Sequence, residues 1–123
     1  MARAAFEPVE TERTLKDMAN DIRREDCIEA CEACAESCDR CADATGSRDT
    51  NMAAICEECA EQCRACVDAL ANGSSEECLP CAETCLKCAS ACEASSDPTC
   101  VECAEKCRKC AIACERIAPQ TAF

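Results

Sequence analysis

The sequence CEACAESCDRCA fills Cys31–Ala42, and its pattern of cysteines returns three more times further along the chain. The later copies are CEECAEQCRACV at Cys56–Val67, CLPCAETCLKCA at Cys78–Ala89 and CVECAEKCRKCA at Cys100–Ala111. In each copy cysteine recurs at steps of three and four residues, which places the thiols on one face of an α-helix. Positions that usually hold leucine in a helical bundle therefore hold cysteine.

The composition of the 123 residues gives two opposing signals. Leu, Ile, Val and Phe together number 14 and the formal net charge is -12, a combination that is typical of disordered chains. The regular repeat favours a folded chain, because disorder needs no helical period. Since buried thiols can act as small apolar side chains, we expect a single domain with cysteine in its interior.

Charge and hydropathy argue against several classes of function. An acidic chain lacks the basic face that nucleic-acid binding requires. No segment approaches the ~20 apolar residues of a membrane span, and residues 1–26 show no apolar region followed by a signal cleavage site. We therefore expect a cytoplasmic protein with no nucleic-acid partner and no membrane contact.

The cysteines are poorly placed for disulfide bonds. The chain has 19 of them, so complete pairing within one chain is impossible. Neighbours at three or four residues on a helix have Cβ atoms ~5–6 Å apart, whereas a disulfide needs roughly 3.5–4.5 Å. A disulfide scaffold of the secreted kind is therefore disfavoured.

The pattern predicts four cysteine-bearing helices of similar length, at about residues 27–45, 52–71, 78–94 and 98–118. Joints of about four to seven residues make consecutive helices antiparallel neighbours. We predict an all-α fold, an antiparallel up-down-up-down four-helix bundle with a cysteine-lined core. The inward face of each helix, which carries its cysteines, is called the seam. Alanines follow the second and fourth cysteines of the repeat; they flank the seam and allow the helices to approach closely. The glutamates beside these alanines face solvent.

Several residues mark the predicted boundaries of these helices. Gly46 suits the left-handed position after the first helix, and Thr50 or Asn51 can cap the second. Asp97 followed by proline is a typical start for the fourth.

The start of the third helix is less regular. Ser74 and Glu77 have the spacing of a capping box, but Pro80 would then lie inside the helix, at a cost of roughly 3 kcal/mol. The third helix therefore either begins late, near Cys78, or bends at the proline.

The N-terminal segment forms a second pattern. Leu15, Met18 and Ile22 are spaced as one helical stripe, but Cys27 follows five residues later, a rotation of ~140° away from that stripe. We favour a separate short helix within residues 1–26, packed outside the bundle or on another subunit; the alternative is one continuous helix. The bundle then spans residues 27–118, and residues 119–123 form a tail.

A column of thiolates favours Cu(I) over other metals. Zinc in four thiolates carries a charge of -2, so several buried zinc sites would repel one another. Iron–sulfur clusters need cysteines that converge from loops. Cu(I) is soft and accepts two thiolates, and one Cu(I) replacing one thiol proton leaves the interior neutral. We expect multiple Cu(I) ions, about one per cysteine.

The predicted metal ligands are all the cysteines, together with Met52 as an entrance residue: Cys27, Cys31, Cys34, Cys38, Cys41, Cys56, Cys59, Cys63, Cys66, Cys78, Cys81, Cys85, Cys88, Cys92, Cys100, Cys103, Cys107, Cys110 and Cys114. The seam extends to Leu70 and Ile117 at one end, where they can form an apolar plug. At the other end it extends to Met52, with Thr45 and Ser95. A thioether is a weak, exchangeable ligand for Cu(I), so copper is expected to enter there, although Met52 could equally just fill the opening.

No constellation for catalysis is visible. The chain contains no histidine and no tyrosine, and no loop is typical of a cofactor site. We predict that the protein is not an enzyme.

The four in-register CxxCAExCxxC copies resemble the bacterial copper storage proteins, and the resemblance extends over residues 27–117. It implies a four-helix bundle that holds many Cu(I) ions, a cytosolic type of member, and a homotetramer with the N-terminal segment on the outside of the bundle. Members of that family often have histidines with methionine near the copper entrance. Here only Met52 matches.

Two other functions remain open from the residues. One is a general thiol-rich buffer for soft metals, with a role like that of metallothionein. The other is a structural bundle in which the thiols only fill the core. Helicity without metal separates copper storage from the first, since metallothioneins lack a preformed scaffold, and tight binding of many Cu(I) ions would exclude the second.

Overall fold

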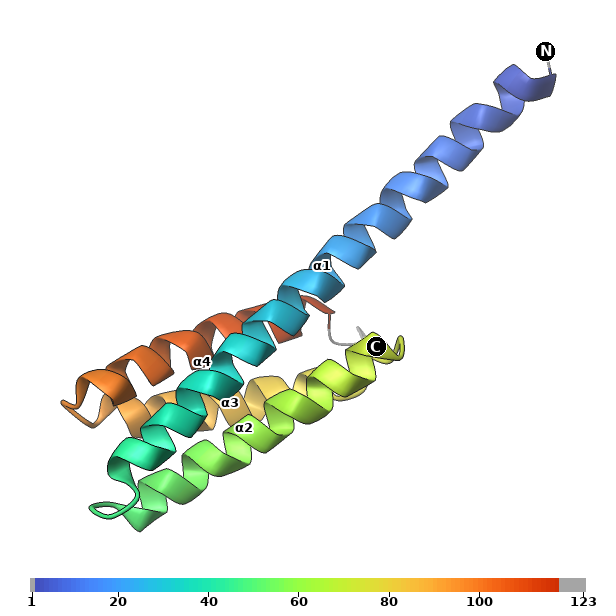
Figure 1. Cartoon of the computed structure of the whole chain (residues 1–123). Coiled ribbons are helices and arrows are strands. Elements are labelled where there is room, and N and C mark those ends of the chain that lie inside the picture. Colours follow the sequence, from blue (N-terminus) through green and yellow to red (C-terminus); the bar gives the residue numbers. More distant parts are fainter. Residues whose placement is uncertain (1, 118–123) are drawn as a thin grey trace.

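The computed structural model describes residues 2–117, with their side chains from residue 23 onward. Its helices are α1 (Ala2–Thr45), α2 (Thr50–Ala71), α3 (Cys78–Glu93) and α4 (Pro98–Ile117). Each helix packs on the next one in the chain, and α4 packs on α1. The predicted all-α, antiparallel four-helix bundle is therefore confirmed (Figure 1). The predicted tail at 119–123 lies outside the described residues.

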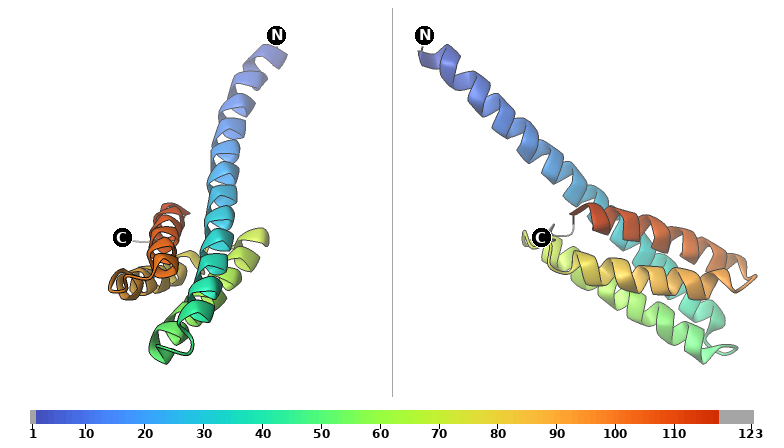
Figure 2. Two further views of the ribbon diagram at one scale, coloured as in Figure 1. Left: turned by 60° about the vertical axis from the view of Figure 1, so that its left-hand side comes forward. Right: turned by 180° about the vertical axis from the view of Figure 1, so that it is seen from behind.

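The first helix is continuous, so the preferred expectation of a separate N-terminal helix was wrong. The residues between Ile22 and Cys27 include neither glycine nor proline, and Arg and Glu among them are good helix formers, so the sequence contains no stop signal. The N-terminal part of α1 projects well beyond the other helices (Figure 2). Its side chains lie outside the described ones, and the division at residues 26 and 27 stays a prediction.

The joint between α1 and α2 differs in detail from the prediction. Gly46 does not adopt a left-handed conformation, because the chain turns through hydrogen bonds from the N–H groups of Arg48 and Asp49 to the carbonyl oxygen of Thr45, at 2.9 and 2.7 Å. The N-cap of α2 is Asp49, whose Oδ1 accepts from the backbone N–H of Met52 at 3.0 Å. Neither Thr50 nor Asn51 is the cap, since both lie inside the helix.

The left-handed glycine is found after α2 instead. Gly73 has φ 85°, and two backbone hydrogen bonds close the helix behind it, Gly73 N–H to Leu70 at 3.0 Å and Ser74 N–H to Ala69 at 2.8 Å. This is a Schellman motif. It ends α2 and sends the chain back toward α3.

The starts of α3 and α4 follow the sequence signals. α3 begins at Cys78, which is the later of the two predicted starts, so Pro80 lies in the first turn where its missing N–H has no helical acceptor anyway. α4 begins at Pro98, and Asp97 caps it by accepting from the N–H of Thr99 at 2.8 Å. Both helices therefore present their cysteines from the first turn onward.

The core consists of thiols and alanines. Every cysteine is 0% exposed, and the alanines beside the seam are buried as well: Ala35, Ala42, Ala60, Ala82, Ala89, Ala104 and Ala111. The glutamates predicted to face solvent, Glu36, Glu61, Glu83 and Glu105, are exposed. Leu70 is the largest fully buried side chain. A bundle with such small core residues brings four helices close around a narrow column of sulfur.

Candidate metal centre

The four helices supply the column of sulfur almost equally. Five cysteines lie on each of α1, α3 and α4 and four lie on α2, where Met52 occupies the seam position one turn before Cys56. All the cysteines predicted as ligands point into this interior, and none forms a disulfide. The thiols are thus gathered in one place rather than divided among separate CxxC sites.

Sulfur atoms of different helices lie near van der Waals contact. The Sγ of Cys34 on α1 is 3.5 Å from that of Cys107 on α4, and 3.9 Å from those of Cys59 on α2 and Cys85 on α3. Along one helix, Cys34 and Cys38 are 3.9 Å apart. A soft metal ion that enters the lumen, the space between the four seams, would therefore contact sulfur atoms from several helices at once.

The sulfurs form overlapping groups of four. Within each group the Sγ atoms all lie within 4.8 Å of one another. Cys114 belongs to two such groups, as do Cys34 and Cys107. Five of the groups are Cys27/Cys66/Cys78/Cys114, Cys31/Cys66/Cys81/Cys114, Cys34/Cys63/Cys85/Cys110, Cys34/Cys38/Cys59/Cys107 and Cys38/Cys88/Cys103/Cys107. Shared members join these five groups into two sets, and the 3.4 Å contact between the sulfurs of Cys31 and Cys110 connects the two sets into one column.

Burial and mutual hydrogen bonding control the charge of the thiols. Burial raises the pKa of the Cys41 thiol, and its hydrogen bond with Cys100 raises it further. Deeper in the column, the hydrogen bond with Cys107 raises the pKa of Cys85, whereas the one with Cys110 lowers the pKa of Cys81. A thiolate is thus tolerated only where a neighbouring thiol donates to it. Extensive ionisation of the column requires cations.

The first end of the column carries Leu70 and Ile117, beside a hollow of about 210 Å³ that Arg23, Arg24 and Arg116 also line. The group Cys27/Cys66/Cys78/Cys114 lies there, with Cys27 and Cys114 3.5 Å apart at their sulfur atoms. Leu70 is only 2% exposed, and Ile117 packs against the same core. The sequence placed both residues correctly at this end.

The opposite end lies next to a second hollow. The sulfurs of Cys41 and Cys100 are 3.0 Å apart, and Cys92 is 3.9 Å from Cys41. Met52 Sδ lies 4.0 Å from the sulfur of Cys92. Beyond them is a hollow of about 390 Å³ whose lining includes the three residues predicted for this end, Thr45, Met52 and Ser95.

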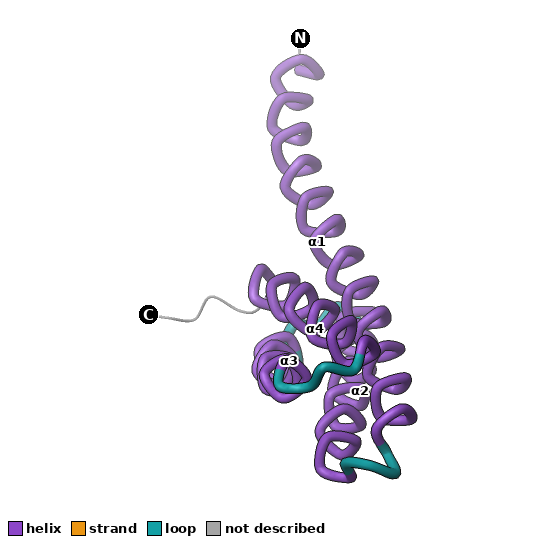
Figure 3. Tube along the Cα trace, turned by 90° about the vertical axis from the view of Figure 1, so that its left-hand side faces the viewer, coloured by secondary structure: helices purple, strands orange, loops and turns teal. Residues whose placement is uncertain are grey.

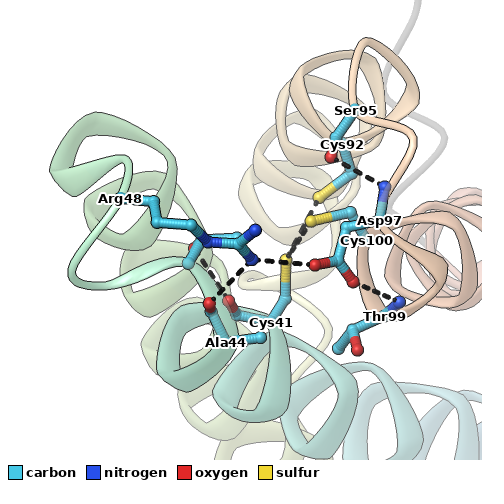
Figure 4. Close-up of polar contacts among 9 residues, drawn as sticks. Cys41, Ala44, Arg48, Cys92, Ser95, Asp97, Thr99 and Cys100 are labelled. Atoms are coloured by element: carbon cyan, nitrogen blue, oxygen red, sulfur yellow. Dashed lines mark hydrogen bonds and ion pairs between the residues drawn. The ribbon is translucent and has the colours of Figure 1, made fainter.

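Arg48 and Asp97 form a bridge beside the hollow that the sequence did not reveal. Arg48 Nη2 donates to the carbonyl oxygen of Ala44 at 3.0 Å and to Asp97 Oδ2 at 2.9 Å. The pair connects the α1–α2 joint with the α3–α4 joint, two loops at the same end of the bundle (Figure 3). Arg48 and Asp97 lie next to Cys41 and Cys100 (Figure 4). Their separation by 49 residues left no local signal for the contact.

Comparison with known proteins identifies a family. A model of the copper storage protein family matches residues 19–119. The fold is also similar to that of Cu(I)-bound copper storage protein BsCsp3, with 30% identity, a TM-score of 0.74, and coverage of 79% of this chain and 99% of the other. None of the curated proteins matches this sequence.

Two further solved structures show the same likeness. One, from Streptomyces lividans, is described as a cytosolic copper storage protein loaded with five coppers; it is 31% identical, covers 80% of this chain and 94% of its own, and has a TM-score of 0.74. A protein from Nitrosospira multiformis is 32% identical, with coverage of 80% and 96% and a TM-score of 0.70. Among the described residues, no helix is both long and apolar enough for a membrane crossing.

Proposed function

The chain belongs to the copper storage protein family, and from this premise we propose how its thiols hold and exchange Cu(I). It binds and stores multiple Cu(I) ions through cysteine thiolates inside the four-helix bundle. The observation that carries this function is the column itself: 19 fully buried thiols with sulfur neighbours on other helices. All the proposed ligands lie on the four helices and none lies on a loop. The bundle is therefore proposed to act as a prebuilt container for the ions.

The proposed capacity is about one Cu(I) per cysteine. Each Cu(I) that replaces a thiol proton adds no net charge, so the interior can fill completely without building up electrostatic repulsion. The shared membership of Cys34, Cys107 and Cys114 in neighbouring groups of four supports thiolates that bridge two ions. If every ion has two thiolate ligands and every thiolate bridges two ions, the column holds one ion per sulfur.

Four sulfurs that lie within 4.8 Å of one another could also surround a zinc ion. This observation favours the second candidate function, a general buffer for soft metals. Zinc needs four thiolates of its own per site, so 19 cysteines could serve only about four ions. Each site would carry a charge of -2 in a buried column, and the repulsion between sites would grow with filling. Of the two metals, Cu(I) is therefore the one that can bind along the whole column.

All 19 cysteines are proposed as Cu(I) ligands, with Met52 as a transient ligand at the entrance. Support for Met52 comes from its contact with Cys92 and its position in the lining of the hollow. Leu70 and Ile117 are proposed to close the other end. Storage involves binding and release without turnover, because the chain has no histidine and its thiols form a metal-binding column.

A cytoplasmic location and a homotetramer complete the proposal. The cytosolic description of the Streptomyces lividans relative supports the location. Exposed apolar side chains on α3 and α4 support self-association: Leu79 and Ile112 are each 51% exposed, Val101 46% and Leu86 40%. Light scattering should give a mass of roughly four times 13.1 kDa, and replacing Leu79 and Ile112 with serine should lower it. A native monomer would contradict the tetramer without affecting copper binding.

The ligand assignment is tested by removing sulfur from the centre of the column. Cys34 has sulfur neighbours on all three other helices, so a Cys34→Ser, Cys107→Ser variant should lose about two Cu(I) per chain. Helicity of the metal-free variant, measured by circular dichroism, controls for folding. An unchanged capacity in a folded variant would remove both residues from the ligand set.

A further inference from the structure

The hollow beside Met52 has the features of a binding site for a small polar molecule. Its volume of about 390 Å³ falls in the range of small-ligand pockets. Its lining includes the polar residues Thr45, Ser95 and Ser96, together with Met52, whose Sδ lies 4.0 Å from the sulfur of Cys92. A molecule held here would lie beside Met52, and Met52 contacts the outermost thiols through Cys92.

Among the described residues that line this hollow, Arg48 is the only cation. Its two hydrogen bonds, to Ala44 and Asp97, both come from Nη2, and the N–H groups on Nε and Nη1 make none with a described residue. A guanidinium has five N–H donors in a fork that matches a carboxylate. Arg48 can therefore receive a second carboxylate while it keeps Asp97 or in exchange for it.

The two acidic residues of the wall are already engaged. Asp49 Oδ1 accepts from the N–H of Met52, and Asp97 accepts from Thr99 and from Arg48. The Arg48 guanidinium and the Thr99 N–H hold the pKa of Asp97 below its ordinary value. Asp97 therefore stays ionised at neutral pH, and Arg48 is the group in the hollow that offers donors to an incoming anion.

The chemistry of Cu(I) indicates which anion would bind in the hollow. A soft monovalent ion is carried by thiolates, and a complex with two thiolates has a net charge of -1 before any carboxylate is counted. Such a carrier approaches a chain with a net charge of -12, so the overall field opposes its arrival. A local cation beside the open end offsets this repulsion where the transfer occurs.

We propose that this hollow binds a small carboxylate-bearing thiol as its Cu(I) complex, with Arg48 holding the carboxylate; the inference rests on the proposed entrance beside Met52. Transfer is a ligand exchange. The sulfurs of Cys92 and Cys41, 3.9 Å apart, replace the two carrier thiolates on the ion. Each protein thiol gives its proton to a departing thiolate, so two neutral carrier thiols leave. The copper stays monovalent and no electrons are transferred.

The test compares two carriers that share one thiol. Apo protein is loaded anaerobically at low salt from Cu(I)–glutathione and from Cu(I) with glutathione diethyl ester, which lacks free carboxylates, and the initial rates are measured. The net charge of -12 favours the more cationic ester. A faster rate with the acid form therefore reports a local contact, and we expect the acid form to load about fivefold faster, the size of one exposed ion pair.

Two variants locate the contact. Arg48→Met should make the ester the faster carrier, whereas Arg108→Met, which removes an exposed arginine paired with Glu93 on the outside of α3 and α4, should keep the native order. A direct readout on the apo protein is the NMR shift of Ser96 on adding S-methylglutathione, expected in the native chain and absent in Arg48→Met. A faster ester on the native protein, or equal rate ratios in the two variants, would overturn the proposal.

The final copper content of the same samples separates this proposal from the storage function. Equal capacities with equal rates for both carriers would refute only the docking of the carrier. A native capacity of a few ions per chain would instead refute storage by the whole column.

Discussion

Met52 Sδ lies 4.0 Å from Cys92 Sγ and lines the hollow at the open end of the column. Met52 keeps 8% of its surface exposed, whereas each cysteine of the column is fully buried. Among the described side chains that line the lumen, Met52 is therefore the sulfur-bearing residue that solvent still reaches.

Met52→Leu should slow copper loading while leaving the final number of ions per chain nearly unchanged. Leucine preserves the volume and the packing against Cys92 but removes a weak, exchangeable ligand. Stopped-flow loading from a Cu(I) complex measures the rate, and the end point gives the capacity. Loading as fast as in the native chain would mean that Met52 only fills the opening.

Leu70→Ala should destabilise the metal-free bundle by about 2–5 kcal/mol, because it removes the largest fully buried side chain and leaves a cavity at the closed end. Glu83→Ala is the control, since Glu83 is exposed on the outside of α3 and its replacement should change stability by no more than about 0.5 kcal/mol. Urea unfolding of both apo variants measures the difference. Equal stabilities would show that Leu70 is not a packing element.

The metal-free bundle should lose stability in alkaline solution. Hydrogen bonds between thiols raise the pKa of Cys85 and lower that of Cys81, whereas burial raises the pKa of both thiols and of Cys41. Burial therefore sets the direction of the expected change. The same thiols ionise at about 8.5 in the unfolded chain, so their contribution to stability is complete below that pH and is lost as the pH rises above it.

Denaturant unfolding at about pH 7.5 and about pH 9.5 tests this window. The copper-loaded protein is the control, because its sulfurs have already lost their protons and should give little change over the same range. An apo protein that is as stable at the higher pH as at the lower would mean that the thiols are not held protonated by burial.

Asp49→Ala should cost about 1 kcal/mol of stability, since its carboxylate satisfies the N–H of Met52 at the start of α2. Asn51→Ala, one residue into the helix, should be nearly neutral or slightly stabilising because alanine is the better helix former. Thermal unfolding of the two variants compares the caps directly. A larger loss in Asn51→Ala would contradict the assignment of Asp49.

The bundle and its lining were predictable because spacing alone defines the seam. Steps of three and four residues put every cysteine on an inward face, and the short joints made consecutive helices antiparallel neighbours. The same reasoning placed Leu70 and Ile117 at one end and Met52 at the other. It also placed the start of α4 correctly, because the Asp97–Pro98 pair is a strong local signal.

The features that the sequence did not predict depend on competition between neighbouring residues for the same role, or on contacts between segments that are distant in the chain. Asp49, Thr50 and Asn51 are all good caps, and only the course of the turn after Thr45 selects Asp49. The two helical stripes on either side of residue 25 suggested a break, but no residue there stops a helix. The contact between Arg48 and Asp97 joins two loops whose proximity follows from the closed bundle and not from either local sequence.

An anaerobic titration of the apo protein with Cu(I), in the presence of a competing chelator, tests most directly the proposal that the whole column acts as a single Cu(I) site. The titration should show tight binding of about 19 ions per chain, one for each cysteine. Saturation at about four ions or fewer, the number that separate four-sulfur sites could hold, would contradict it.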